Sequence, residues 1–294
     1  MSRVFASPFL KPMLAVVTNI DKEHLDFYRD LEEIKTVFLS FLDRIPFYGL
    51  AVLCLDNEPI QEMIPKLKKR YTTYGMSAQA DFQIRDVQFS QRKSRFKVYH
   101  RGQKMGTIDL NLPGIHNVYN ATASIAVGVE LDVGFDQIRA ALESVEGVQR
   151  RLEIKGDIDE ITVIDDYGHH PTEIKVTLEA IEENWPGRRK VVVFQPHRYS
   201  RTRALFDEFS RAFYQFDILV VMPIYAASEK RIEGVSSKKL CEEVKAHGHK
   251  EVIYASGFKA AFSFLKNNLR PGDVLLTLGA GDVWKVGTEI LKKF

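Results

Sequence analysis

The sequence predicts an α/β protein with two domains, the second of which contains a doubly wound parallel sheet. In the second half, short apolar runs typical of strands alternate with helical stretches, as in parallel sheets covered by helices on both faces. This pattern begins near residues 147–151, and the chain has 294 residues, enough for about two domains of roughly 150 residues. We therefore expect one domain over residues 1–149 and a second over residues 150–294.

The composition is that of an ordinary globular protein. Hydrophobic residues make up 45% and charged residues 27% of the chain, and a formal net charge of +2 is too close to neutral to indicate a nucleic-acid or membrane surface. Cys54 and Cys241 lie far apart, which argues against a disulfide framework. No apolar run approaches the ~20 residues of a membrane helix, and no export signal is visible. We expect a cytoplasmic protein that binds neither nucleic acid nor membranes.

The first half opens on a buried strand almost at the first residue, so we expect upstream structure to be missing and the free strand edge to favour aggregation. Pro113-Gly114 ends a stretch of alternating polar and apolar residues. The expected elements are a strand at 14–17, a helix that includes 31–42, a strand at 49–55, strands within 78–110 joined by a hairpin turn at 101–104, and a helix at 117–131.

The second half should place ligands at the carboxyl ends of its parallel strands. Three segments directly follow expected strands there: Asp165 to Pro171, Gln195 to Arg203, and Gly279 to Asp282. The expected strands are at 161–164, 191–194, 218–222, 252–254 and 274–278.

The first of these segments combines two carboxylates, a phenol and two imidazoles, Asp165-Asp166-Tyr167-Gly168-His169-His170. Carboxylates at a strand end can hold ribose hydroxyls or a metal-bound phosphate, and imidazole can move protons near neutral pH. An equally good interpretation is that Asp166 caps the next helix and the histidines are solvated. A structural zinc site is less favoured because no cysteine lies nearby.

The second segment, Gln195 to Arg203, is strongly basic. Arg198 and Arg201 are three residues apart and share one face if a helix begins there. Positive charge at a helix N-terminus opposes the macrodipole unless an anion offsets both. Guanidinium groups bind carboxylates and phosphates well, so a binding site for an amino-acid carboxylate is favoured over a solvated basic helix start.

The remaining polar segments are weaker signals. In the loop at 18–26, His24 is as well explained by a surface histidine as by a metal or phosphate contact. Asn117 and Asn120 at a helix start could meet a purine edge, but capping is the better interpretation. The Gly279-Ala280-Gly281-Asp282 turn is explained by close strand-to-helix packing, and no G-x-x-x-x-G-K-[ST] pattern occurs in the chain.

Together these segments resemble the Mur ligases, in particular the members that add alanine, from about residue 8 to the end. Asp165 to Glu173 and Gln195 to Thr202 are the most specific stretches. The other matching segments, in the family's order, are Thr18-Asn19-Ile20-Asp21 with His24, Pro46-Phe47-Tyr48-Gly49, His116-Asn117 with Asn120, and Arg150-Arg151-Leu152-Glu153.

The resemblance implies a truncated central ATPase-type domain followed by a Rossmann-like, doubly wound C-terminal domain. It implies an ATP- and Mg²⁺-dependent ligase of peptidoglycan precursor synthesis. The carboxylate of UDP-N-acetylmuramate would attack the γ-phosphate of ATP to form an acyl phosphate, and the amine of L-alanine would then displace phosphate. Stabilisation of charge dominates such chemistry.

The resemblance also implies roles for individual residues. His24 would help to hold Mg²⁺. Asn117 and Asn120 would contact adenine, while Arg151, Asp165 and Asp166 would contact the nucleotide from the last domain. The alanine pocket would consist of Tyr167, His169, Arg198 and Arg201, of which His169, Arg198 and Arg201 would be catalytic.

The sequence departs from the family pattern at its start. Family members carry a UDP-sugar-binding domain and a Gly-rich loop ending in Lys-Thr before this region, and an acidic residue where Ser2 to Pro8 stands. One hypothesis is therefore a separately encoded N-terminal half that completes the enzyme. Two alternatives stay open: a non-catalytic module that binds a nucleotide and an amino acid, and a related Mur ligase that adds a peptide.

A polypeptide of these 294 residues alone is expected not to turn over. The loop lysine and its backbone amides form the main cradle for ATP phosphates in such enzymes. The measurement is phosphate release from ATP in the presence of UDP-N-acetylmuramate, Mg²⁺ and L-alanine. Release above the blank would contradict the expectation.

Overall fold

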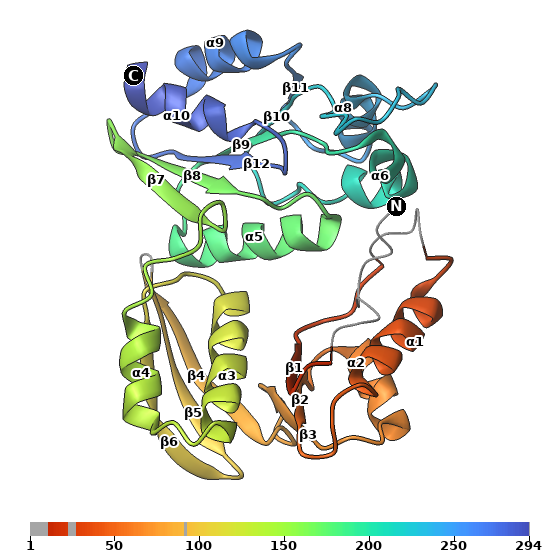
Figure 1. Cartoon of the computed structure of the whole chain (residues 1–294). Helices are drawn as coiled ribbons and strands as arrows, with labels where there is room; N and C mark the ends of the chain where they lie inside the picture. The colour runs from red at the N-terminus through yellow and green to blue at the C-terminus, as the bar shows by residue number, and fades with distance from the viewer. Residues whose placement is uncertain (1–10, 23–27, 91–92, 294) are drawn as a thin grey trace. The chain divides into compact units, whose positions relative to one another are not determined.

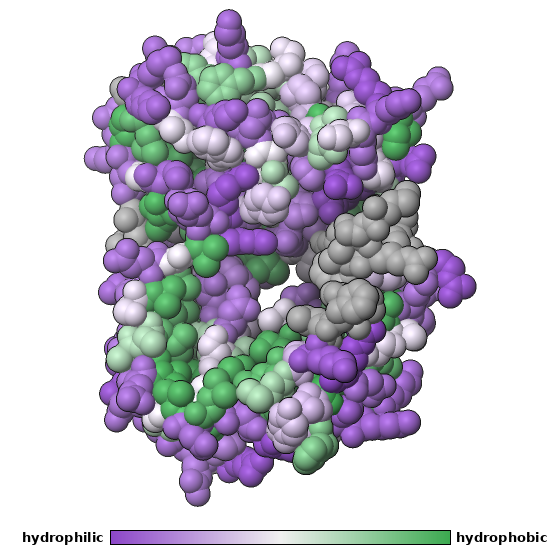
Figure 2. Space-filling model, in the orientation of Figure 1, coloured by the Kyte–Doolittle hydropathy of each residue, from purple (hydrophilic) through white to green (hydrophobic). Residues whose placement is uncertain are grey.

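The computed structural model describes residues 11–22, 28–90 and 93–293 of the chain (Figure 1). The chain divides into two compact units, Met1–Glu146 and Gly147–Phe294, here called unit 1 and unit 2. Each unit contains its own sheet. Figure 2 shows that the visible surface of both units is mainly hydrophilic, with hydrophobic residues in smaller patches. No helix of the described ranges has the length and apolar character needed to cross a membrane.

Unit 1 contains a six-stranded sheet in the order β1-β2-β3-β4-β5-β6. The pairs from β1 to β4 are parallel, and β4, β5 and β6 form an antiparallel meander. The strands are β1 Leu14–Val17, β2 Leu50–Cys54, β3 Tyr71–Gly75, β4 Phe82–Ser90, β5 Lys93–His100 and β6 Gln103–Leu110. The helices are α1 Leu31–Leu42, α2 Glu58–Met63, the 3-10 turn η1 Ile64–Lys66, α3 Ile115–Glu130 and α4 Phe135–Glu143.

The sequence patterns explain these elements. Helix α1 begins at Leu31 because the Asp30 carboxylate accepts the backbone N–H of Glu33 at 2.9 Å. All residues of β2 are buried, as expected for an apolar strand covered on both faces. The expected strand at 14–17, the helix over 31–42 and the hairpin are confirmed, although the turn occupies only Arg101-Gly102.

Unit 2 contains the predicted parallel sheet, in the order β11-β10-β9-β12-β8-β7. The strands are β7 Glu153–Ile158, β8 Ile161–Asp166, β9 Lys190–Phe194, β10 Ile218–Val221, β11 Val252–Tyr254 and β12 Val274–Leu278. The helices are α5 Pro171–Asn184, α6 Tyr199–Ala204, α7 Phe206–Ser210, α8 Ser237–Ala246, α9 Phe258–Asn268 and α10 Trp284–Lys293. Figure 1 shows α5 on one face of this sheet and α9 and α10 on the other.

The five strands expected in the second half are all present, and β7 is an addition. It pairs antiparallel with β8 at the edge of the sheet, and its residues are at least partly exposed, so it lacks the apolar run of a buried strand. The last strand, β12, lies between β8 and β9. The parallel strands β8, β12, β9 and β10 are neighbours in the sheet, so their carboxyl ends lie next to one another. This carboxyl side of the sheet is called its carboxyl edge below.

Candidate functional site

The candidate site lies at this carboxyl edge of the unit 2 sheet. Four aromatic side chains from the loops after β8, β9 and β10 form a continuous row, here called the ring row. Tyr167 contacts His169 with ring centroids 5.3 Å apart, His169 contacts His197 at 5.8 Å, and His197 stacks on Tyr225 at 5.6 Å. The row brings together residues separated by more than 50 positions in the sequence.

The backbone holds the β9 and β10 loops together beneath the ring row. The Arg198 N–H donates to the Tyr225 carbonyl at 2.8 Å, and the Tyr225 N–H donates to the Pro196 carbonyl at 2.8 Å. Tyr225 was not among the predicted site residues. The signal that could have found it is its position a few residues after the expected strand at 218–222, at the same sheet edge as the predicted segments.

The two predicted arginines flank the ring row at the start of α6. Arg198 is the N-cap residue, with a φ of 69°. The nearest Arg201 guanidinium nitrogen lies 3.4 Å from His197 Nδ1, while Arg198 lies 3.8 Å from the carboxylate of Glu229. Cationic groups, a phenol and imidazoles therefore share one small region.

Glu229 supplies an anion at the start of α6 that the sequence argument missed. Its carboxylate accepts the Ser200 hydroxyl at 2.6 Å and the Ser200 N–H at 3.0 Å. Burial alone would raise the pKa of Glu229, but the hydrogen bonds from Ser200 and Tyr199 and the charge of Arg198 lower it overall. The charge of Arg198 is thus partly offset within the protein, while Arg201 has no comparable carboxylate within the described residues.

His197 is held neutral by its surroundings. Burial, followed by the charges of His169, Arg201 and Arg198, lowers the pKa of His197 to about 4, and Glu229 acts in the opposite direction. At neutral pH His197 therefore contributes a ring and hydrogen-bonding atoms to the site, but no third positive charge.

This shift predicts a pH dependence of stability. As the pH falls, the unfolded chain takes up a proton on His197 near the ordinary pKa of 6.5, whereas the folded chain resists protonation until about pH 4. The stability that depends on neutral His197 is complete above pH 6.5 and is lost as the pH falls toward 4. His197→Gln should therefore lose less stability than the parent chain between pH 7 and pH 4.5 in urea unfolding. Equal losses in the two proteins would contradict this prediction.

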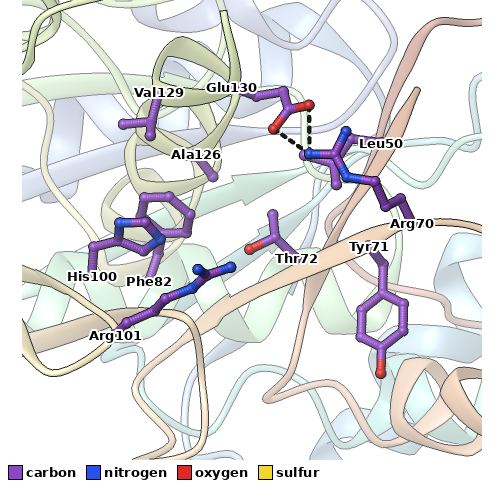
Figure 3. Close-up of a pocket in the computed structure, with 10 residues that line it drawn as sticks. All are labelled: Leu50, Arg70, Tyr71, Thr72, Phe82, His100, Arg101, Ala126, Val129 and Glu130. Atoms are coloured by element: carbon purple, nitrogen blue, oxygen red, sulfur yellow. Dashed lines mark hydrogen bonds and ion pairs between the residues drawn. The ribbon is translucent and has the colours of Figure 1, made fainter. Parts of the chain in front are cut away.

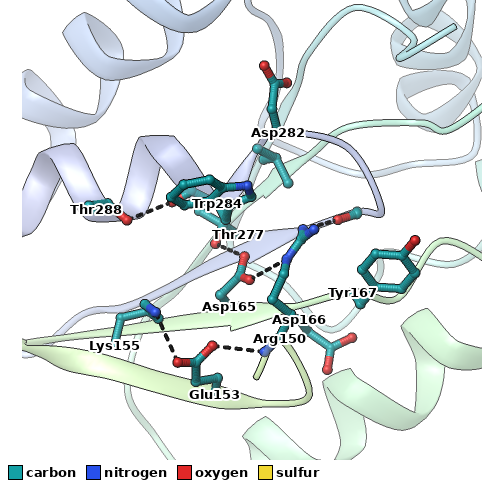
Figure 4. A network of polar contacts seen from close by, with 12 residues as sticks. Arg150, Glu153, Lys155, Asp165, Asp166, Tyr167, Thr277, Asp282, Trp284 and Thr288 are labelled. Atoms are coloured by element: carbon teal, nitrogen blue, oxygen red, sulfur yellow. Dashed lines mark hydrogen bonds and ion pairs between the residues drawn. The ribbon is translucent and has the colours of Figure 1, made fainter. Parts of the chain in front are cut away.

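A buried polar network lies beside the ring row, at the ends of β8 and β12 (Figure 4). Asp165 is only 1% exposed. Its carboxylate accepts Arg150 Nε at 3.0 Å and the Thr277 hydroxyl at 2.6 Å, and Arg150 also donates to the Gly279 carbonyl at 2.6 Å. Burial, the largest influence, raises the pKa of Asp165 despite these donors.

Asp166 is also occupied by protein donors. It accepts the backbone N–H of Leu152 and of Gly168, both at 2.7 Å, and the Thr177 hydroxyl at 3.2 Å. The interpretation of Asp166 as a helix cap is wrong, because His170 is the N-cap of α5 and forms a capping box with Glu173. The contacts of Asp165 and Asp166 support a role in positioning the Arg150–Leu152 segment. Their predicted contact with ATP stays a prediction.

Arg151 is more accessible than its neighbour Arg150. Its side chain is 50% exposed and lies 3.4 Å from Glu173, and its guanidinium lies 5.6 Å from the centre of the Tyr167 ring. A guanidinium in this position can still reach a phosphate from solution, and the predicted nucleotide contact of Arg151 stays a prediction.

The Gly279–Asp282 turn packs closely, but its glycines contact the loops after β9 and β10 rather than forming the predicted strand-to-helix contact. Gln195 accepts the N–H groups of Asp282 at 2.9 Å and Val283 at 3.2 Å. A Cβ added at Gly281 would lie 2.2 Å from the Gln195 side-chain oxygen and 2.8 Å from the Tyr225 ring. Glycine at 281 therefore lets the turn support the ring row.

In unit 1, Asn117 and Asn120 both lie in the first turns of α3. The Asn117 amide donates to the Pro113 carbonyl at 2.7 Å, whereas the N-cap position is Gly114 and has no side-chain cap. Asn120 is exposed. The capping interpretation is thus wrong for the N-cap itself, and the predicted contact of both residues with adenine stays a prediction.

A carboxylate at the end of β2 holds the start of α3 in unit 1. Asp56 accepts the Tyr119 hydroxyl at 2.6 Å and the Ser77 N–H at 3.0 Å.

His24, the predicted Mg²⁺ contact, lies outside the described residues. Over the described ranges, no group of three or more His, Cys, Asp or Glu side chains is arranged to hold a metal.

Comparison with known protein families gives two matches in succession. The model of the Mur ligase middle domain matches residues 3–128, and the model described as Mur ligase, glutamate ligase domain matches residues 150–281. The first match lies wholly within unit 1 and the second wholly within unit 2.

Among curated proteins, the chain is similar to enzymes named UDP-N-acetylmuramate–L-alanine ligase. A UDP-N-acetylmuramate–L-alanine ligase of Desulforapulum autotrophicum is 59% identical over 97% of this chain and 63% of the relative. One of Geobacter sulfurreducens is 50% identical over 97% of this chain and 62% of the relative. The chain thus spans a little over three fifths of the length of these relatives. None of these comparisons supports a separately encoded N-terminal half.

Solved structures agree on the fold. The UDP-N-acetylmuramate–alanine ligase of Thermotoga maritima matches with a TM-score of 0.77 and 26% identity, over 96% of this chain and 60% of that one. The MurF ligase of the same organism, in complex with ADP, matches with a TM-score of 0.76 over 96% of this chain and 63% of that one. At 19% identity, this match supports only a shared fold.

Proposed function

We propose that this chain, which belongs to the Mur ligase family, supplies the amino-acid site and part of the nucleotide site of an ATP-dependent ligase that joins L-alanine to UDP-N-acetylmuramate. The reaction would serve peptidoglycan precursor synthesis. The observation that carries the proposal is the pairing of Arg198 and Arg201 with the ring row at the carboxyl edge of the unit 2 sheet. The 59% identity to a ligase of that name supports it.

The arginines suit the carboxylate of the amino acid. Arg201 has no carboxylate partner of its own within the described residues, while Arg198 shares Glu229 with Ser200. A guanidinium can donate two parallel hydrogen bonds to a carboxylate, and neutral His197 avoids a third charge beside the pair. Tyr167 and His169 would then flank the amino group and the methyl group of alanine.

His169 is suited to take the proton that alanine must lose. His169 Nδ1 lies 3.0 Å from the Tyr167 carbonyl oxygen, which can only accept, so Nδ1 carries a hydrogen and Nε2 is the basic nitrogen. In the proposed step one ammonium proton passes to Nε2. The freed amine pair then bonds to the acyl carbon, whose bond to the phosphate oxygen breaks, and the second proton that the nitrogen must lose leaves with the departing phosphate.

The nucleotide end of the site would use Asn117 and Asn120 for adenine and Arg151 for phosphate. The side-chain oxygen of Asn117 can still act as an acceptor, because the hydrogen bond to the Pro113 carbonyl uses the amide nitrogen. ATP supplies the phosphoryl group in this proposal. His24 would be a contact for Mg²⁺. A cytoplasmic location fits two buried cysteines without a disulfide.

The proposal can be tested in a chimera that also contains the part of a relative that this chain does not match. In it, this chain replaces the matching part of the Desulforapulum autotrophicum relative, which is 59% identical. We expect ADP release that requires both UDP-N-acetylmuramate and L-alanine. A folded chimera that releases ADP only with a peptide in place of L-alanine would favour the peptide ligase, and one that binds nucleotide without turnover would favour the non-catalytic module.

A further inference from the structure

Unit 1 contains a cavity of about 150 Å³ that is separate from the residues discussed above (Figure 3). Its apolar lining consists of Leu50, Phe82, Ala126 and Val129, and its polar lining of Arg70, Tyr71, Thr72, His100, Arg101 and Glu130. The His100 ring stacks on Phe82 with centroids 4.2 Å apart and an interplanar angle of 9°. The cavity therefore has one wall formed by two stacked rings, and part of its lining is apolar.

The cavity lies at the opposite end of the unit 1 strands from the proposed adenine contacts. Leu50, Tyr71 and Phe82 are the first residues of β2, β3 and β4, whereas Asn117 lies at the start of α3 and Val129 at its end. Twelve residues of helix separate these two, which corresponds to ~18 Å. The cavity is thus not an extension of the nucleotide site.

The two arginines of the cavity differ in their charge partners. A single guanidinium nitrogen of Arg70 lies 2.9 Å from both carboxylate oxygens of Glu130. Arg101, in the turn between β5 and β6, makes no ion pair or side-chain hydrogen bond within the described residues. Figure 3 shows its guanidinium pointing toward the space between Thr72 and the His100–Phe82 pair. Arg101 is therefore the cationic lining residue that has no ion pair within the described part of the chain.

We propose that this cavity binds a small carboxylate monoanion with a short apolar tail. The fork of Arg101 would hold the carboxylate in bidentate fashion, with the Thr72 hydroxyl beside it. The tail would lie on Leu50, Ala126 and Val129. This inference does not depend on the proposed ligase function.

Size and charge limit the ligand. A volume of about 150 Å³ corresponds to roughly five water molecules at ~30 Å³ each, which suits an acid of a few carbons. The charged lining residues Arg70, Arg101 and Glu130 sum to +1. Asp81, which accepts the Thr72 hydroxyl at 3.2 Å, lies next to the lining and brings the sum of these four charges to zero. A phosphate dianion is therefore disfavoured relative to a monoanion.

The test consists of separate titrations of the whole chain with butyrate, its neutral analogue butyramide, and inorganic phosphate. Changes in amide NMR chemical shifts report binding. Butyrate should bind at least tenfold more tightly than either of the others and should shift the signals of Thr72, Phe82 and His100. Arg101→Gln should weaken butyrate binding at least tenfold. Glu130→Gln should tighten it several-fold, because a negative charge leaves the lining.

Lys104→Gln is the matched control, since it removes a positive charge from the same hairpin but from outside the lining. It should change butyrate binding less than twofold. The inference is overturned if butyrate and butyramide bind alike, if neither binds, or if Lys104→Gln weakens butyrate binding as much as Arg101→Gln. Both tryptophans lie in unit 2, so the folding of unit 1 in each variant is checked by the dispersion of its unit 1 amide NMR signals.

Discussion

Arg150→Met is expected to lower the free energy of unfolding of unit 2 by about 3 kcal/mol. The substitution removes the charge partner of Asp165, which is 1% exposed and keeps only the Thr277 hydroxyl as a side-chain donor at 2.6 Å. A buried, uncompensated carboxylate costs more free energy than the ion pair itself contributes. The penalty should shrink as the pH falls, because Asp165 can then become neutral by taking up a proton.

Urea unfolding, monitored by tryptophan fluorescence, measures this loss of stability in unit 2. Both tryptophans, Trp185 and Trp284, belong to unit 2. Arg211→Met is the matched control, because its ion pair with Asp207 joins side chains that are 55% and 70% exposed and should contribute little to stability. The double variant Arg150→Met, Asp165→Asn should recover part of the loss. If Arg150→Met lowers the free energy of unfolding no more than Arg211→Met does, the Arg150–Asp165 ion pair has no special role in stability.

Arg201→Met is expected to raise the KM for L-alanine by about 100-fold in the chimera, which corresponds to ~2.8 kcal/mol. Arg201 is the guanidinium of the site without a carboxylate partner in the described part of the chain, and a buried charge-assisted hydrogen bond contributes on this scale. The KM values for ATP and UDP-N-acetylmuramate should stay within about twofold, because the arginine is proposed to bind only the amino acid.

Arg203→Met provides the comparison for this second effect. Arg203 lies on the same helix, α6, but its side chain is exposed. The two variants remove the same charge from the same short element, so they differ mainly in access to the ring row. An unchanged KM for L-alanine in Arg201→Met, or equal increases in both variants, would argue against a carboxylate contact at Arg201.

Much of the fold of unit 2 was predictable because its strands are apolar on both faces. The runs at 191–194 and 274–278 are continuous buried strands, and such runs are visible in the sequence without any knowledge of their neighbours. Strand β7 was missed because an edge strand needs no apolar run. The order of the strands, with β12 between β8 and β9, depends on packing that no local pattern encodes.

The same distinction applies to the candidate site. Tyr167, His169, Arg198 and Arg201 were identified because polar groups cluster in short segments directly after strands. Tyr225 and Glu229 were missed because each looks ordinary in its own segment. They become part of the site only when the β10 loop packs against the β9 loop. The buried state of Asp165 and Asp166 was likewise invisible, since their partners Thr277 and Leu152 come from other elements.

The most direct test of the central claim is a crystal structure of the chimera with ADP and L-alanine. We expect the alanine carboxylate to lie within about 3 Å of a guanidinium nitrogen of Arg198 or Arg201, with Tyr167 and His169 beside the rest of the molecule. Alanine bound elsewhere, with neither arginine in contact with its carboxylate, would contradict the account.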